Sequence, residues 1–207
     1  MNFQEVLEKV KREVFDLEDR IFEKWHGLDL GGVVPHAELI SDRIESVQHA
    51  TAYYAVWCRN LRALLKEARK TGVSIDNFVD IGSGKGKACF FASTTMKFQK
   101  IIGVEFSGPI IDIAIANNNK FPRRDISFVQ ADAAEFLLPA GTNLVFMFNP
   151  FNNVILDRFL ANNLAQLKTE KLLIAYANDV HKESLRTHGF DTIFRDPVRK
   201  ISLHMKN

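Results

Sequence analysis

The stretch Phe78-Val79-Asp80-Ile81-Gly82-Ser83-Gly84-Lys85-Gly86-Lys87 decides the fold of this chain. It begins as an apolar run of β-forming residues and ends in three alternating glycines, and the segment Ala88 to Met96 that follows has helical character. A strand, a glycine turn and a helix in this order form a ligand cradle at the carboxyl end of a parallel strand. Glycines let the backbone turn sharply and approach a ligand, and the N–H groups that open the helix favour an anion.

The spacing of the glycines excludes two common nucleotide motifs. A dinucleotide fingerprint has a third glycine where Lys87 stands, and the P-loop pattern G-x-x-x-x-G-K-[ST] is absent. The segment from Asp80 to Gly86 instead reads Asp-x-Gly-x-Gly-x-Gly. An acid two residues before the first glycine suits a ligand that carries an ammonium group as well as a carboxylate.

Composition points to one ordinary globular unit with an appendage. The chain has 207 residues, of which 46% are hydrophobic and 25% are charged, and its formal net charge is only +2. Neither nucleic acid nor a membrane is therefore an expected partner. Cys58 and Cys89 lack metal spacing, so we expect buried free thiols in a reducing compartment and no metal site. With no signal-peptide pattern and no long apolar run, the expected location is cytoplasmic.

The first third of the chain, residues 1–75, is predicted to be a helical N-terminal extension. Apolar residues recur at helical spacing from Phe3 to Trp25, and this stripe is interpreted as core packing rather than as a partner surface. A loop is expected over residues 28–40, with Ser41 or Asp42 capping a short helix. A further helix is predicted from Ala52 to about Lys70. We expect these helices to form a lid or an acceptor wall.

Residues 76–207 alternate between strand and helix patterns. After the first strand, strands are predicted at 101–105, 126–130, 144–148 and 172–176, with helices between them. The last two strands, 190–194 and 201–205, have no room for a helix between them and must form an antiparallel hairpin. The predicted fold is α/β: a Rossmann-like, doubly wound seven-stranded sheet with a C-terminal antiparallel hairpin, preceded by the helical extension.

The Asp80–Gly86 segment and the terminal hairpin together resemble the class I methyltransferases that depend on S-adenosylmethionine (SAM). The resemblance implies SAM as the cofactor, with the motif residues in its cradle: Asp80, Gly82, Ser83, Gly84 and Gly86. Glu105 stands where a doubly wound fold needs an acid for ribose hydroxyls, although a strand-end acid can also cap a helix. By the resemblance, Asp132 takes the adenine amino group and the backbone beside it, at Ala133, reads the ring.

Asn149-Pro150-Phe151 follows the fourth strand, at the position where the resembled family binds the methyl acceptor. It is similar to a shortened Asn-Pro-Pro-aromatic motif of methyltransferases that act on amino or amide nitrogen, and all three residues are candidate catalytic residues. The single proline departs from that motif, and an Asn-Pro turn can simply end a strand. The N-terminal third is similar to that of small bacterial methyltransferases with the same Asn-Pro-Phe. Tyr53 and Tyr54 either cover the cofactor or pack in the core.

The function expected from these features is SAM-dependent methyl transfer to an unidentified acceptor, with an amino or amide nitrogen of a small molecule or protein as a candidate. One alternative is an NAD(P)-binding oxidoreductase, against which Lys87 and the terminal hairpin count. Another is a non-catalytic SAM-binding module that works through its helical N-terminal part. The sequence names neither the acceptor nor the oligomeric state.

Overall fold

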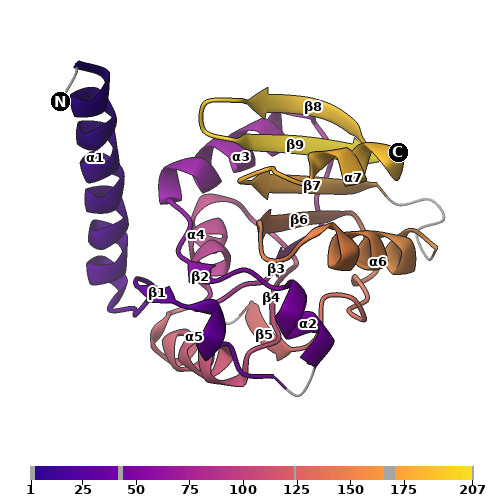
Figure 1. Ribbon diagram of the computed structural model, residues 1–207, viewed down its shortest axis with the longest axis horizontal. Coiled ribbons are helices and arrows are strands. Elements are labelled where there is room, and N and C mark those ends of the chain that lie inside the picture. The colour runs from indigo at the N-terminus through magenta and orange to yellow at the C-terminus, as the bar shows by residue number, and fades with distance from the viewer. Residues whose placement is uncertain (1–2, 42–43, 124, 166–170, 207) are drawn as a thin grey trace.

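The computed structural model describes residues 3–41, 44–123, 125–165 and 171–206. A seven-stranded sheet runs through its centre in the order β5-β4-β3-β6-β7-β9-β8 (Figure 1). The strands are β3 Asn77–Ile81, β4 Lys100–Glu105, β5 Ile126–Gln130, β6 Asn143–Phe148, β7 Leu172–Ala177, β8 Asp191–Asp196 and β9 Ile201–Lys206. The first five of these pair in parallel, whereas β9 is antiparallel to both β7 and β8.

The predicted fold class is confirmed, and so is the C-terminal hairpin. Residues 197–200 join β8 to β9 in a turn that the side chain of Asp196 stabilises, because its Oδ1 accepts the N–H groups of Val198 and Arg199 at 3.0 Å each. Lys200 completes the reversal with a φ of 53°. Such a short link cannot carry a crossover helix, so the two strands must be antiparallel.

Both faces of the sheet are covered. Along β6, Leu144 and Phe146 point into one hydrophobic cluster and Val145 and Met147 into the other, which explains why this strand is an unbroken apolar run. Helices α3 (Cys58–Lys70) and α4 (Lys87–Thr95) cover the first face, and α6 (Asn153–Leu164) and α7 (Lys182–Thr187) cover the second. Helix α5 (Gly108–Lys120) packs against β4 and β5. Cys58 and Cys89 are buried free thiols, as expected.

The prediction of a helix from Ala52 is wrong for its first six residues. Tyr53 and Tyr54 form strand β2, which pairs with β1 (Val33–Val34), and α3 begins only at Cys58. Two forces favour the extended form: aromatic residues suit a strand, and Oδ1 of Asp19 accepts the N–H of Cys58 at 2.9 Å. That bond caps α3 from outside and fixes its first residue.

The segment before α3 otherwise consists of short elements, η1 (His36–Glu38) and α2 (Ile44–His49). Asp42 lies outside the described residues, so its role as a helix cap stays a prediction. Several residues of this part, including Leu28, Leu30 and Val56, share one hydrophobic cluster with strands of the sheet. The division of the chain after residue 75 into an extension and a methyltransferase core stays a prediction.

Helix α1 (Phe3–His26) stands along one side of the molecule (Figure 1). Its inner face is held by Nζ of Lys87, which is buried and lies 2.6 Å from Oδ2 of Asp19 and 3.5 Å from Oε1 of Glu23. Phe22 adds a ring contact with Phe91.

The interpretation of the α1 stripe as core packing is wrong, because Val10, Val14, Leu17, Ile21 and Trp25 are exposed. Phe15 and Phe22 contact the body instead, through Trp57 and Phe91. The helix therefore carries apolar residues on two faces, only one of which packs on the sheet layer. None of the helices in the described ranges is both long and apolar enough to cross a bilayer.

Candidate functional site

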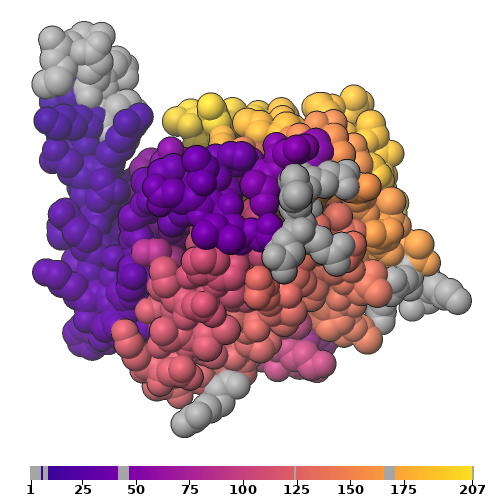
Figure 2. Space-filling model, turned by 60° about the horizontal axis from the view of Figure 1, so that its bottom comes forward, coloured from indigo at the N-terminus to yellow at the C-terminus, as the bar shows by residue number. Residues whose placement is uncertain are grey.

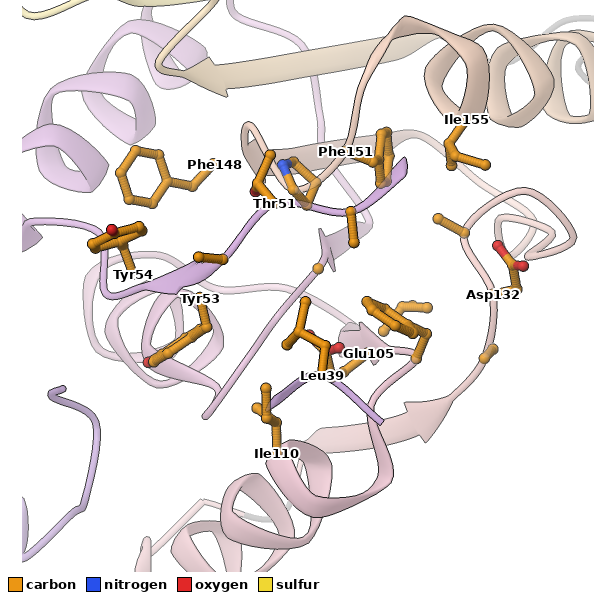
Figure 3. A pocket seen from close by; sticks show the side chains of 18 residues that line it. Leu39, Thr51, Tyr53, Tyr54, Glu105, Ile110, Asp132, Phe148, Phe151 and Ile155 are labelled. Carbon is orange, nitrogen blue, oxygen red and sulfur yellow. The ribbon is translucent and has the colours of Figure 1, made fainter. Parts of the chain in front are cut away.

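A cavity of about 70 Å³ lies at the carboxyl edge of the sheet, next to the turn that follows β3 (Figure 3). Residues from the ends of β3, β4, β5 and β6 and from the N-terminal segment line it. They are Leu39, Ala50, Thr51, Ala52, Tyr53, Tyr54, Gly82, Val104, Glu105, Phe106, Ile110, Ala131, Asp132, Ala133, Phe148, Pro150, Phe151 and Ile155. Open α/β sheets bind ligands at this edge, so this is the candidate site.

The glycine turn adopts the conformation that its sequence predicts. Gly82, Gly84 and Gly86 have φ values of 74°, 53° and 90°, a region that L-residues with a Cβ rarely occupy. Protein atoms also lie against all three of them, and a Cβ at Gly86 would come within 2.5 Å of the Phe128 ring. A Cβ at Gly82 would come within 2.3 Å of Pro150, and one at Gly84 within 2.1 Å of the Tyr53 ring. Of the predicted cradle residues, only Gly82 lines the cavity itself.

Glu105 ends β4 and faces the cavity (Figure 3). Its Oε2 accepts the N–H of Gly84 and its Oε1 accepts the N–H of Ser107, both at 3.0 Å. Burial raises the pKa of this carboxyl above its ordinary value, although the N–H groups oppose the shift. Glu105 therefore stabilises both the glycine turn and the connection to α5. Because each of its oxygens accepts one of these hydrogen bonds, the carboxylate can still accept hydrogen bonds from further donors.

Asp80 and Ser83 lie close by but do not line the cavity. Asp80 is buried within β3, with Oδ2 3.9 Å from Sγ of Cys89. Burial first, and then the charge of Glu105, raise the pKa of Asp80 well above its usual range. The hydroxyl of Ser83 is buried without a hydrogen-bond partner and lies against Gly103 of β4. A Cβ added at Gly103 would lie 2.9 Å from this hydroxyl oxygen.

Asp132 and Ala133 line the cavity on the far side from the tyrosines (Figure 3). Oδ1 of Asp132 accepts the N–H of Ala134 at 2.9 Å, which stabilises the turn after β5. Apolar side chains of Phe106, Ile110 and Ile155 line the same cavity. The cavity is therefore a slot that has apolar walls and two carboxylates, Glu105 and Asp132, among its lining residues.

The three residues of the Asn149-Pro150-Phe151 segment differ in their positions relative to the cavity. Pro150 and Phe151 line the cavity, and Asn149 does not. Oδ1 of Asn149 accepts the hydroxyl of Tyr176 at 3.2 Å, and its backbone has a φ of 44°, which asparagine tolerates better than most residues. The cap of helix α6 is made by Asn152, whose side chain accepts the N–H of Val154.

Residues 49–54, here named the covering segment, contact this loop. Figure 2 shows the purple, N-terminal part of the chain lying on the surface of the later, magenta and orange part. Thr51 donates its N–H to the carbonyl of Pro150 at 2.9 Å and its hydroxyl to the carbonyl of Asn149 at 2.7 Å. His49 contacts Asn152 through a side-chain hydrogen bond of 2.8 Å. The covering segment is therefore paired with the Asn149-Pro150-Phe151 segment.

Tyr53 connects the covering segment to the glycine turn. Its ring lies on Gly84 and its hydroxyl donates to the carbonyl of Leu30 at 2.8 Å. The neighbouring loop is tied down as well, since Nζ of Lys85 contacts Asp29 Oδ1 and the carbonyl of Gly31, each at 2.8 Å. Burial raises the pKa of the Tyr53 phenol, which stays protonated.

A second, larger cleft of about 580 Å³ adjoins the cavity, and Tyr54 and Phe148 line both. Its walls come from α1, from β1 and β2, and from the hairpin turn. Charged residues of both signs line it: Asp16, Asp19, Arg20, Glu23, Lys87, Arg199 and Lys200. This cleft gives a polar molecule a route to the cavity.

Sequence reasoning missed the apolar walls of the cavity. Phe106 directly follows Glu105, and Ile110 lies in the first turn of α5, so a strand-end acid followed by apolar residues was the available signal. Leu39 had no signal, because its place depends on the path of the N-terminal segment.

No family model matches this chain. Solved structures with the same fold are methyltransferases. The glycopeptide N-methyltransferase MtfA, solved with SAM, is 14% identical with a TM-score of 0.53, over 70% of this chain and 92% of that one. The N-methyltransferase NodS from Bradyrhizobium japonicum is 12% identical with a TM-score of 0.51, over 71% and 93%. Magnesium protoporphyrin IX methyltransferase from Synechocystis, with bound SAM, is 12% identical with a TM-score of 0.50, over 72% and 77%. The chain thus has the Rossmann-like methyltransferase fold.

One curated protein is similar in sequence. Protein disulfide isomerase-like 5-2 from Oryza sativa subsp. japonica is 26% identical over 171 residues, or 74% of this chain. The chain spans only 38% of the length of that relative.

Proposed function

We propose that this protein is a SAM-dependent methyltransferase. The observation that carries the proposal is the slot at the carboxyl edge of a methyltransferase-type sheet, which both Glu105 and Asp132 line. Fold likeness to SAM-bound enzymes supports the same cofactor. The finer assignment, to small bacterial enzymes with an Asn-Pro-Phe acceptor motif, rests on sequence resemblance.

The residues of the slot fit the adenosyl part of SAM. Glu105 has lone pairs left for ribose hydroxyls after its two backbone hydrogen bonds. We assign Asp132 and the backbone at Ala133 to the adenine edge, and Ile110 and Phe106 to the faces of its ring, because all four residues line the slot. A purine needs this combination of apolar faces and polar edges.

The methionine part of SAM requires a movement. The cavity of about 70 Å³ is smaller than the about 300–1,000 Å³ of typical ligand pockets. Tyr53 covers Gly84, on the glycine turn where the resemblance places the methionine part. We propose that this ring turns away when SAM binds. A cation beside Asp80 would then favour the ionised form of this buried carboxyl.

In methyl transfer, the main task of the protein is to align the methyl acceptor with the methyl group of SAM. When bound, SAM supplies a methyl group on a positively charged sulfur, and an acceptor lone pair displaces the thioether. Alignment of two reactants contributes on the order of 7–11 kcal/mol. We assign Pro150 and Phe151 to the wall of the acceptor site, because both line the cavity, and Asn149 to the left-handed turn of this loop. The charged cleft beyond Tyr54 and Phe148 favours a polar or charged acceptor, such as an amine of a small molecule or protein.

Two other activities have less support. An NAD(P)-dependent oxidoreductase would use the same edge, but the antiparallel β8–β9 hairpin departs from a dinucleotide fold. Thiol–disulfide exchange, suggested by the name of the curated relative, needs an accessible thiolate, commonly in a Cys-X-X-Cys pair. Cys58 and Cys89 are buried and far apart in sequence, and burial raises the pKa of both thiols.

Isothermal titration with SAM, S-adenosylhomocysteine, NAD and NADP tests the proposal. We expect binding of the first two only. Glu105→Gln should weaken SAM about tenfold to hundredfold, because a charge-assisted hydrogen bond contributes about 1.5–3 kcal/mol. Glu183→Gln, an exposed acid on α7, serves as a matched control. Preference for NAD, or SAM affinity unchanged by Glu105→Gln in a folded protein, would refute the assignment. Turnover on an acceptor panel then separates an enzyme from a non-catalytic SAM-binding module.

A further inference from the structure

Helix α1 presents an apolar stripe to solvent, and the C-terminal end of the stripe, Ile21 and Trp25, also lines a surface cleft beside Phe91. Its inner face carries Phe15, Asp19 and Phe22, which contact α3 and α4. At 100° per residue, the outer stripe is centred about 140° away from these residues. The stripe comprises Val6, Val10, Val14, Leu17, Ile21 and Trp25, which are between 39% and 83% exposed. A continuous apolar surface with this degree of exposure indicates an interaction site.

The spacing of the stripe is symmetric. Its steps along the chain are four, four, three, four and four residues, so the pattern reads the same from either end. Steps of four, four and three are those of an 11-residue hydrophobic repeat, which pairs helices that are straight or wind with a right-handed supercoil. In an antiparallel pair of such helices, each stripe residue meets another stripe residue of the second copy. Val14 would meet Leu17, Val10 would meet Ile21, and the small Val6 would meet the large Trp25.

We propose that two copies of this chain form a dimer through antiparallel pairing of their α1 helices. A two-fold axis near residues 15 and 16 makes the surface self-complementary, as a symmetric dimer requires. With 24 residues, α1 is about 36 Å long, so the seam extends over several turns.

Charges beside the stripe favour the antiparallel direction. Glu13 and Arg20 are exposed along one edge of the stripe. In the antiparallel pair, Glu13 of each copy lies opposite Arg20 of the other, which makes two interhelical ion pairs. A parallel pair would instead place Glu13 near Glu18 of the second copy, where like charges repel.

The inner-face contacts hold α1 ready for pairing. The buried ion pair of Lys87 with Asp19 and the hydrogen bond from Trp57 Nε1 to Asp16 Oδ1 at 3.0 Å orient the helix before a second copy arrives. Less ordering entropy is then lost on association. Neither contact involves the stripe, so the dimer leaves the inner face unchanged.

Sedimentation velocity of the full chain at micromolar concentrations tests the dimer. We expect a mass of about 47 kDa, twice the 23.5 kDa of one chain. Leu17→Glu should give the monomer mass with an unchanged circular dichroism spectrum, whereas Val198→Glu, at an exposed valine of the hairpin turn, should remain dimeric. A monomeric wild-type protein, or a dimer that Leu17→Glu does not dissociate, overturns the proposal.

Two further measurements test the direction of the helices. Glu13→Arg should weaken the dimer, and adding Arg20→Glu should restore it by reversing the ion pair. On oxidation, a mixture of Val10→Cys and Ile21→Cys proteins should form the mixed disulfide, because these positions face each other; the native thiols are buried. Disulfides that join Val10→Cys chains to one another would overturn the antiparallel arrangement. Dissociation by vesicles of anionic lipid would indicate a membrane as the occupant and refute a second copy.

Discussion

Gly84→Ala should destabilise the protein in two separable ways. The backbone of Gly84 has a φ of 53°, and an L-residue in the left-handed region costs about 1–2 kcal/mol. The new Cβ would also lie 2.1 Å from Cε2 and 2.4 Å from Cδ2 of Tyr53. Overpacking of this kind costs about 1–3 kcal/mol. We therefore expect a total loss of about 2–5 kcal/mol in the free energy of unfolding.

A double-mutant cycle with Tyr53→Ala separates the two terms, with urea unfolding followed by circular dichroism. Removal of the ring should relieve the overpacking and leave the backbone strain, so we expect a coupling of about 1–3 kcal/mol. Gly72→Ala is the control, because its φ is 70° and a Cβ there meets nothing within 4 Å. The reasoning fails if Gly84→Ala costs no more than Gly72→Ala, or if the cycle is additive.

Two further predictions concern the site. Burial and the charge of Glu105 raise the pKa of Asp80, so the folded protein keeps a proton that the unfolded chain has lost. Stability should therefore fall as pH rises from about the usual value of 3.8 through the raised pKa. In urea unfolding at several pH values, Asp80→Asn should reduce this dependence of stability on pH. A profile in Asp80→Asn identical to wild type would contradict this. Asn149→Gly and Asn149→Ala both lose the hydrogen bond from Tyr176, but Asn149→Ala should be about 1–2 kcal/mol less stable than Asn149→Gly because of the positive φ. Both variants should retain SAM affinity, and equal thermal stability of the two would contradict the backbone role.

The order of strands and helices could be predicted because local patterns determine it. The apolar run at 144–148, the glycine turn and the short link at Asp196-Pro197 each permit few structures. The start of α3 could not be predicted, since it depends on Asp19 accepting the N–H of Cys58 across 39 residues. Which face of α1 packs inward was equally hidden, because both faces are apolar.

The candidate site divides in the same way. Strand-end residues such as Glu105 and Asp132 were placed correctly at the sheet edge, because parallel strands bring their carboxyl ends together. The covering segment was not foreseen, since its pairing with Pro150 joins residues about a hundred positions apart. The position of the Tyr53 ring on Gly84 follows from that pairing. Packing against this ring therefore requires a glycine at the second position of the motif, whether or not a ligand binds there.

Lys87 offers the last prediction, because it replaces the third glycine of a dinucleotide motif with a buried cation. Lys87→Met would leave the carboxylates of Asp19 and Glu23 without their partner, and breaking a buried pair in this way costs about 3–5 kcal/mol. Lys66→Met, at an exposed lysine on α3, should stay within about 0.5 kcal/mol of wild type in urea unfolding. Adding Asp19→Leu should recover part of the loss, but not the bond that caps Cys58. The loss in Lys87→Met should also shrink as pH falls, because burial raises the pKa of Glu23 and protonation neutralises this carboxylate. A loss that is below about 1 kcal/mol, or that grows toward low pH, would show that this ion pair does not hold α1.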